Sequence, residues 1–335
     1  MDWNKGFSAR YYGTFVDPVT WRDIDRFEIT GGSISKTESD KMQSADVDCT
    51  EYPTGEHWIR LHLVAKQNDS SVHDALFTGL ACSPEDNFDG YRNNKAVQAY
   101  SVLKPAEDVL LERGWYAPAD ADAARLMVKL LSVTPAPKMI DGDSPRLKQA
   151  IIAEDGETRL SMTHKILDAI GWRMRISGDG TITFCPKATE SLATFDPLYA
   201  DSIEPKVTVK NDWYDCPNVY RAAADDLTAI ARDESDDSML SIQNRGREIW
   251  KEDNSVSLGD SESIADYALR KLREEQQHYI TVSYDRRYIP DVMVSDLITL
   301  NYPAQRVVGT YMIQSQTIEL GYSARTSEEV VKYEY

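Results

Sequence analysis

Histidine side chains bind metals and transfer protons, and this chain has five of them. They are His57, His62, His73, His164 and His278, and no two have the HExxH or HxH spacing of a metal site. His57 and His62 are five residues apart in a segment of alternating apolar and polar residues. A strand there places them on opposite faces. The histidine spacing therefore predicts no metal-assisted hydrolysis.

Other motifs that carry chemistry are missing as well. The sequence has no GxSxG nucleophile turn, no Walker loop and no GxGxxG loop. The acidic run Asp233-Glu-Ser-Asp-Asp237 lacks the spacing and the glycine of an EF-hand, so we interpret it as a solvated loop. The chain has 55 acidic residues, and spacing singles out no pair for glycosidase chemistry. We expect no catalytic residues, no metal ligands and no cofactor.

The four cysteines are Cys49, Cys82, Cys185 and Cys216, and none forms a CxxC pair. This spacing argues against a zinc site. The N-terminus lacks an apolar run, and no stretch approaches the 18 apolar residues of a membrane helix. We therefore expect free buried thiols, no membrane segment, and a protein that is made and folded in a cytoplasm.

The net charge of −18 is the strongest compositional signal. A surface of this charge disfavours binding to a nucleic-acid backbone, which requires a basic face, although simple solubility explains it equally well. Residues 188–260 carry 7 basic and 16 acidic side chains, which is half of the net negative charge. Trp213, Tyr214, Tyr220 and Trp250 interrupt this segment, which is typical of acidic loops between strands.

The elements that would position any site are clearest in Ile166–Pro186. This stretch predicts the end of an amphipathic helix, a glycine stop at Gly171, and a hairpin whose turn is Ser177-Gly-Asp-Gly180. We expect these glycines to supply the positive φ angles of the turn. Arg173 and Arg175 alternate with apolar residues, so they lie on one face, and we expect them to meet solvent or a neighbouring subunit. The unit itself implies no chemistry.

The segments on both sides of this unit are rich in strands. Alternating or aromatic patterns predict strands over 7–15, 26–30, 57–64, 97–103, 279–284, 297–302 and 310–319. Residues 206–210 and 218–223 look like partner strands, and 241–250 is a strand or a turn leading into one. Helices are predicted over 106–112, 120–131, 158–170 and 261–278, with a short one after Ser144-Pro145 to about Ala153. Asp120 or Asp122 is the expected cap of the second, and Asp260 or Ser261 that of the longest. The predicted class is α+β, mainly β.

Four segments together resemble the hub proteins of phage tails and related contractile injection machines. They are Asp17-Pro-Val-Thr-Trp21 with the following 27–34, the unit Ile166–Pro186, Ser241–Trp250 with Asn244-Arg-Gly-Arg247, and Pro290–Leu300. The resemblance implies two antiparallel β-barrels akin to the tail-tube fold, with an α/β domain inserted between them. The implied domains are residues 1–104 for the first barrel, 105–200 for the inserted domain, and 201–335 for the second barrel with its long helix.

The same resemblance implies a structural function. Three subunits would form a pseudo-sixfold ring that joins the tail tube, or a distal tail protein, to a spike or tip protein. DNA would pass through the bore without specific binding, and a tape-measure protein is a possible further partner. The location would be the virion tail. Some hubs are fused to a C-terminal lysozyme or peptidase domain, and the end of this chain at Tyr335 leaves no room for one.

Two alternatives stay open at this point. One is a tail-associated enzyme that degrades the cell wall, against which the missing catalytic residues argue. The other is a carbohydrate-binding adhesin, drawing on 18 tyrosines and 7 tryptophans, which are equally expected in barrel cores and interfaces.

Overall fold

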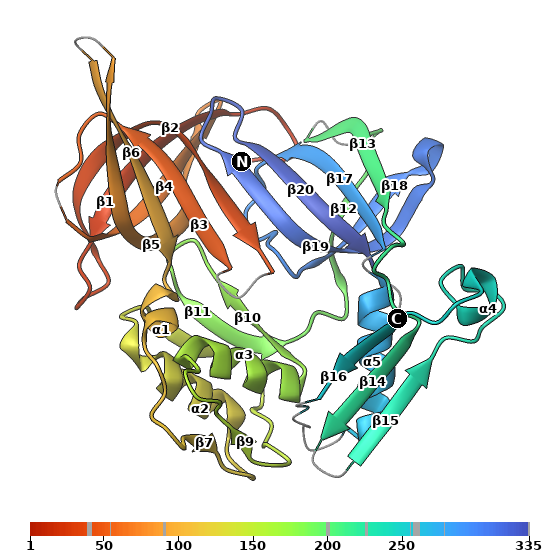
Figure 1. Cartoon of the computed structure of the whole chain (residues 1–335). Coiled ribbons are helices and arrows are strands. Elements are labelled where there is room, and N and C mark those ends of the chain that lie inside the picture. The colour runs from red at the N-terminus through yellow and green to blue at the C-terminus, as the bar shows by residue number, and fades with distance from the viewer. Residues whose placement is uncertain are drawn as a thin grey trace.

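A computed structural model of the chain is mainly β, with few helices (Figure 1). It describes residues 1–38, 42–53, 55–89, 92–198, 202–224, 227–254, 256, 262–277 and 279–333. In this part of the chain no helix is long and apolar enough to cross a membrane. The coarse class prediction is confirmed: a large, mostly antiparallel sheet dominates the fold.

The first six strands form a closed ring of hydrogen bonds. They are β1 (Ser8–Val16), β2 (Asp23–Thr37), β3 (Gln43–Cys49), β4 (His57–Gln67), β5 (Ser70–Asp89) and β6 (Arg92–Ser101). Their order is β1-β4-β5-β6-β3-β2, and a β1–β2 pairing closes it. Alternate residues of β4, such as Ile59, Leu61 and Leu63, are fully buried in the ring. The period-two pattern seen in the sequence is therefore the inward face of this strand.

Six later strands form a second, open sheet. They are β12 (Ser191–Phe195), β13 (Ile203–Asn211), β17 (Ile280–Arg287), β18 (Leu297–Tyr302), β19 (Val307–Glu319) and β20 (Arg325–Lys332). The order is β12-β18-β19-β20-β17-β13, curled around a core that includes Tyr284, Ile298 and Leu300. Among the described residues no pairing joins β12 to β13, although the Tyr302 hydroxyl donates to the Glu204 carbonyl at 2.8 Å.

One long strand joins the two sheets. The first half of β19 pairs with β18, and its second half, Ser315–Glu319, pairs antiparallel with Ser33–Thr37 of β2. The first apolar core continues across this join, because Ile318 and Leu320 pack inside it. The two six-stranded sheets are therefore hydrogen-bonded to each other as parts of one twelve-stranded sheet, and they share part of one core.

An α/β unit lies below the first ring (Figure 1). Its elements are α1 (Lys104–Asp108), β7 (Tyr116–Ala117), α2 (Ala123–Leu130), the 3-10 turn η1 (Leu131–Val133), β8 (Lys138–Ile140), β9 (Ile151–Ile152), α3 (Arg159–Ile170), β10 (Trp172–Ile176) and β11 (Ile182–Pro186). Thr158 caps α3 by accepting from the Ser161 N–H, and Gly171 ends it in the left-handed region. The helix, stop and hairpin predicted for Ile166–Pro186 are confirmed.

A smaller layer interrupts the second sheet between β13 and β17. It contains β14 (Val219–Ala224), β15 (Leu227–Arg232), the short α4 (Ile242–Arg245), β16 (Trp250–Asp253) and α5 (Ile264–Gln277). The helix α5 covers one face of the three-stranded sheet through Tyr267, Ala268 and Leu272, as its predicted apolar stripe requires. The cap of α5 is Ser263, whose hydroxyl accepts from the Asp266 N–H at 3.1 Å, whereas the expected caps Asp260 and Ser261 lie outside the described residues.

Two local predictions are wrong. No helix follows Ser144-Pro145, because the Ser144 hydroxyl accepts from the Ala124 N–H and so caps α2 beside Asp122, the expected cap. Residues 206–210 do not pair with 218–223: β13 pairs with β17, and β14 pairs with β15 and β16. The buried Asn218 holds β14 beside β16, since its side chain accepts from the Ile249 N–H and donates to the Arg247 carbonyl. The domain boundaries stay a prediction.

Candidate functional site

The nearest approach to a catalytic arrangement is a trio on the first ring. The Thr14 hydroxyl lies 3.1 Å from His62 Nε2, and an Asp23 oxygen lies 3.3 Å from the same nitrogen. Burial lowers the pKa of His62, and Asp23 raises it by less. A catalytic triad instead uses the two ring nitrogens separately, one toward the nucleophile and one toward the carboxylate. This trio therefore does not supply a proton relay.

The other histidines and the cysteines do not form a site together. His57 and His62 are on β4, His73 is on β5 and His164 is on α3, while His278 lies outside the described residues. Within the described ranges no three His, Cys, Asp or Glu side chains are placed to hold a metal. All four cysteines are free, and all but the half-buried Cys82 are buried.

The acidic run 233–237 is mostly exposed, as predicted, except that its first residue has a structural role. The Asp233 carboxylate accepts hydrogen bonds from Ser235, Ser238 and Gln276, the last at 3.0 Å. Burial raises the pKa of Asp233, but these hydrogen bonds outweigh it and lower the pKa below its usual value. Asp233 thus fastens the loop to α5.

The polar residues that the fold does bring together lie at the joint of the two sheets. Glu328 on β20 and Arg286 on β17 form an ion pair with both side chains fully buried, Nη2 to Oε1 at 2.5 Å and Nε to Oε2 at 2.9 Å. The Tyr284 hydroxyl and the Gln316 amide donate to the same carboxylate. Every oxygen of Glu328 is therefore satisfied, as a buried charge requires. We call these four residues the joint cluster.

A second link crosses the same joint. The Tyr288 hydroxyl, from the turn after β17, donates to the Asp74 carboxylate on β5 at 2.6 Å. The Tyr11 hydroxyl on β1 donates to the Gly321 carbonyl at 2.9 Å. The two halves are thus held by side chains as well as by the β2–β19 pairing.

The tip of the β10–β11 hairpin binds the outside of the first ring. The Thr78 hydroxyl donates to the Gly178 carbonyl at 2.8 Å. The Asp179 carbonyl accepts from the Trp21 indole at 2.9 Å and from Arg60 Nη2 at 3.0 Å. Only Gly180 of this turn has a positive φ, of 84°, contrary to our expectation for both glycines. Gly178 is required for a different reason, because a Cβ there would lie 1.6 Å from the Ala75 carbonyl oxygen.

The base of the same hairpin binds the second half. Arg173 and Arg175 lie on one face, as predicted, but their partner is Asp296 of the same chain, at 3.1 Å from each. The Arg173 guanidinium also donates to the Ser295 carbonyl. Asp296 is buried, so we correct the expectation that these arginines meet solvent or another subunit. The hairpin is a strut between the two sheets.

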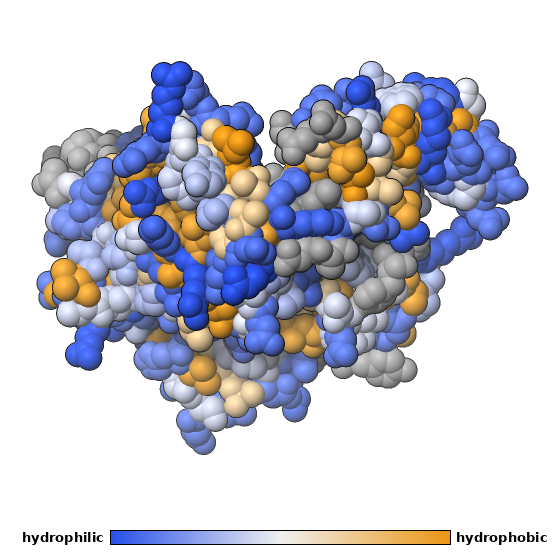
Figure 2. All heavy atoms as spheres, turned by 90° about the horizontal axis from the view of Figure 1, so that it is seen from below, coloured by the Kyte–Doolittle hydropathy of each residue, from blue (hydrophilic) through white to orange (hydrophobic). Residues whose placement is uncertain are grey.

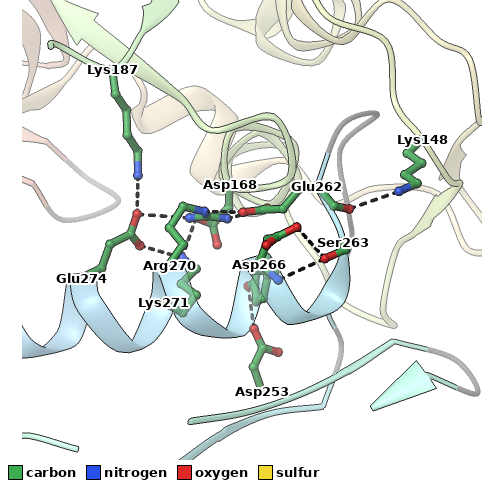
Figure 3. Close-up of polar contacts among 11 residues, drawn as sticks. Lys148, Asp168, Lys187, Asp253, Glu262, Ser263, Asp266, Arg270, Lys271 and Glu274 are labelled. Carbon is green, nitrogen blue, oxygen red and sulfur yellow. Dashed lines mark hydrogen bonds and ion pairs between the residues drawn. The ribbon is translucent and has the colours of Figure 1, made fainter. Parts of the chain in front are cut away.

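A third set of contacts fastens α5 to the α/β unit (Figure 3). Lys271 of α5 reaches Asp168 of α3 at 2.7 Å, and Lys187, just after β11, reaches Glu274 of α5 at 2.9 Å. Burial raises the pKa of Glu274, but Lys187, Lys271 and Arg270 outweigh it and lower the pKa to about 2. Glu274 is therefore charged at any physiological pH, and these pairs hold the small layer in place.

The exposed surfaces that take no part in these contacts include strand edges and separate apolar patches. On β13 nearly every residue after Ile203 is exposed, including Val209 at 41%. Leu192 on β12 and Leu198 beyond it are also exposed. Figure 2 shows that on the face seen from below apolar residues form separate patches among polar ones. Unpaired edges of this kind are ready to pair with another chain.

No protein-family model matches the sequence, and no curated protein matches it. Solved structures do match over nearly the full length. The tail protein from Neisseria meningitidis has a TM-score of 0.71 at 11% identity, covering 98% of this chain and 96% of that chain. The 43 kDa tail protein of prophage MuSo2 from Shewanella oneidensis has a TM-score of 0.69 at 11% identity, covering 98% and 97%.

The chain has the fold of phage tail proteins. A type VI secretion component of E. coli, described as structurally similar to the T4 bacteriophage tail proteins gp27 and gp5, is more distant. Its TM-score is 0.53 at 8% identity, and the match covers 92% of this chain and 75% of that one. Sequence reasoning missed the partners of the hairpin, since Trp21 and Asp296 are far from it in the chain.

Proposed function

We propose that this chain is a structural hub subunit of a phage tail or a phage-derived injection machine, without enzymatic turnover. Three copies would form a ring with two similar sheets per subunit, and so a pseudo-sixfold arrangement. The ring would join the tail tube or a distal tail protein to a spike or tip protein, in the virion tail. The observation that supports this most is the pair of six-stranded sheets in one chain, joined through β19, in a tail-protein fold.

The physical reason for two sheets per chain is symmetry. A sixfold tube offers six equivalent contacts and a threefold spike offers three, so a trimer of double sheets can meet both. We propose that both sheets are tube-like barrels and that the second is completed in the ring, where its open seam between β12 and β13 would meet a neighbouring subunit. The exposed β13 edge supports this, because its unpaired backbone N–H and C=O groups can pair with a strand of another chain.

Passage of DNA fits the charge of the chain. Like charges repel, so a bore lined by acidic residues would not retain a phosphate backbone. The net charge of −18 supports such a bore. Purified chain should cause no electrophoretic shift of double-stranded DNA at physiological salt, and tight DNA binding would contradict this part of the proposal.

The decisive experiment is native mass spectrometry of the full chain with electron microscopy of the same sample. We expect a species of three times the 37.9 kDa chain mass and a threefold ring. Val209→Asp on β13 should lower the trimer fraction, while Leu269→Asp, which changes a 40% exposed residue on α5, should leave it unchanged. A chain that stays monomeric at every concentration, or that hydrolyses peptidoglycan in a zymogram, would overturn the hub proposal.

A further inference from the structure

One face of the joined sheet points away from both apolar cores. The strands β3, β2, β19, β20, β17 and β13 lie side by side in this order (Figure 1). Ile34 and Ile318 are buried in the first core and Tyr284 in the second, so the residues beside them on each strand point the opposite way. Residues in register on neighbouring strands share a face. The register from β3 to β17 therefore gives one row across this face: Ser44, Ser35, Thr317, Ser327 and Asp285.

Two further rows lie beside the first, and all three rows consist of Ser, Thr, Asp and Glu. The second row continues onto the edge strand β13 and is Thr37, Ser315, Glu329, Ser283 and Thr208. The third row is Asp46, Ser33 and Glu319. We call these three rows the joint face. None of its side chains is cationic, aliphatic or aromatic, and three of its carboxylates, on β3, β19 and β20, are exposed.

Basic side chains stand at the margins of the joint face. Arg325 and Arg287 lie opposite each other at one end, where Arg325 binds Asp285 at 2.5 Å. Lys210 lies on the edge strand β13 and binds Asp212 at 3.2 Å. The rows between these margins therefore present carboxylates and hydroxyl groups.

The small layer has an exposed sheet face of a different kind. On its side away from α5, Arg221 pairs with Glu252 at 3.5 Å and Arg232 with Glu248 at 2.5 Å, and Ile230 among them is 48% exposed. The joint face has no such mixture. It lacks the cations that bind a phosphate backbone and the apolar side chains that protein–protein interfaces bury at their centre. Its composition is therefore suited to permanent contact with water.

The joint face is also hollowed. A cavity of about 280 Å³ opens on it, and the residues around this cavity include Thr208, Ser283, Ser315, Thr317 and Ser327, from four neighbouring strands. The inner wall of a ring is concave and its outer wall is convex. A concave face that stays wet is therefore expected on the inside of a ring.

We propose that the joint face lines the bore of the ring and that double-stranded DNA moves along it. This proposal rests on the hub function proposed above and adds which residues would meet the DNA. The carboxylates would repel the phosphates, and the hydroxyl groups would hold water between the wall and the DNA. Because the three rows hold no cation that could replace the counterions of the DNA, the backbone would gain no binding energy there.

The topology of the DNA distinguishes a bore from an outer surface. Asp46→Lys combined with Glu329→Lys puts two cations per subunit on the joint face, both at exposed positions. The ring of this double variant should bind linear duplex DNA roughly tenfold more tightly than the unaltered ring at physiological salt, because the new lysines replace counterions. A relaxed, covalently closed circle cannot thread a preformed ring, so its binding should not change. Equal binding of circular and linear DNA by the variant, or no gain with linear DNA, would overturn the proposal.

Glu234→Lys combined with Asp236→Lys is the matched control. Both residues are exposed in the loop 233–237, and the charge of the chain changes by the same amount. This control should show no preference for linear over circular DNA. A preference as strong as that of the joint-face variant would show that charge alone produces the effect, and would overturn the proposal.

Electron microscopy gives the second measurement and separates this proposal from the hub function. A gold label on Thr317→Cys, in a chain that also carries Cys82→Ser, should appear inside the bore. A label on the outside of a threefold ring would overturn the assignment of the joint face and leave the hub function standing. A chain that forms no ring in native mass spectrometry would overturn both.

Discussion

Gly178→Ala tests whether the hairpin strut holds the fold together. The added Cβ would lie 1.6 Å from the Ala75 carbonyl oxygen and 2.4 Å from its carbon, far inside van der Waals contact. Ala75 lies within β5, where it pairs with His62 of β4, and the pairing of β5 with β6 begins further along, at Gly79. Because the β4 pairing holds the ring backbone here, we expect the hairpin tip to retreat by more than an ångström.

The expected cost follows from the contacts that such a retreat breaks. Three hydrogen bonds join the tip to the ring, at 2.8, 2.9 and 3.0 Å, and the donor of the last is the Arg60 guanidinium. A neutral hydrogen bond contributes about 1 kcal/mol and a charge-assisted one about 1.5–3 kcal/mol. We therefore expect Gly178→Ala to lower the free energy of unfolding by about 3–5 kcal/mol.

Urea denaturation and limited proteolysis measure the two consequences. The midpoint should fall, and cleavage near the Trp21 loop and the hairpin should become faster, since both lose their anchor. Gly321→Ala is the matched control: its Cβ would meet nothing within 4 Å, and its φ is not in the left-handed region, so its effect should stay within about 0.5 kcal/mol. Equal stability of the two variants would refute the close approach of tip and ring.

Three further outcomes follow from buried groups. Glu328→Gln should lower the free energy of unfolding, measured by urea denaturation, by about 3–5 kcal/mol, because it leaves the Arg286 guanidinium buried without its counterion. A decrease under about 1 kcal/mol would contradict a buried ion pair in the joint cluster. Lys36 has a pKa of about 8 when folded and 10.5 when unfolded, so the folded chain binds fewer protons between these values and stability should rise with pH across that window. The contribution of Lys36 is the difference in free energy of unfolding between the unaltered chain and Lys36→Met, measured across this pH range. If that difference does not change with pH, Lys36 is not desolvated. A thiol reagent at neutral pH should modify Cys82 before Cys49, since Cys49 is buried and burial raises its pKa to about 11; the reverse order would be inconsistent with these environments.

Local signals in the sequence predicted the local elements. Thr158 and Gly171 bound α3 because a hydroxyl cap and a left-handed glycine act within one turn of the chain. Ser144 shows the limit of such signals. Its hydroxyl was expected to cap a helix beginning at Pro145, and that prediction is wrong: it accepts from the N–H of Ala124 in α2, 20 residues earlier, a partner that only the tertiary fold brings to it.

Pairings between distant strands could not be predicted, for a related reason. A period-two pattern tells which face of a strand is buried and leaves its partner open. The pairing of Ser315 with Thr37 joins residues from opposite ends of the chain. Arg286 is an example. A charged residue at an inward-facing position of β17 is explained only by its ion pair with Glu328 of β20, a strand that the pattern does not identify as its neighbour. The sequence therefore predicted a strand-rich fold and left its joint undetermined.

The two glycines of the hairpin turn show the difference between local signals and contacts of distant segments. Gly180 adopts a φ of 84°, which the rules for tight turns require and the sequence alone predicts. Gly178 needs no unusual φ, and its glycine is explained by the Ala75 carbonyl on a strand a hundred residues earlier. An alanine at Gly178 in an isolated hairpin would thus be harmless, and in the folded chain it is expected to detach the strut. The loss of stability in Gly178→Ala therefore measures the docking of the hairpin tip on the first ring. The loss in Gly180→Ala would measure the strain in the turn together with the contacts of the added Cβ with Thr78 and Trp21.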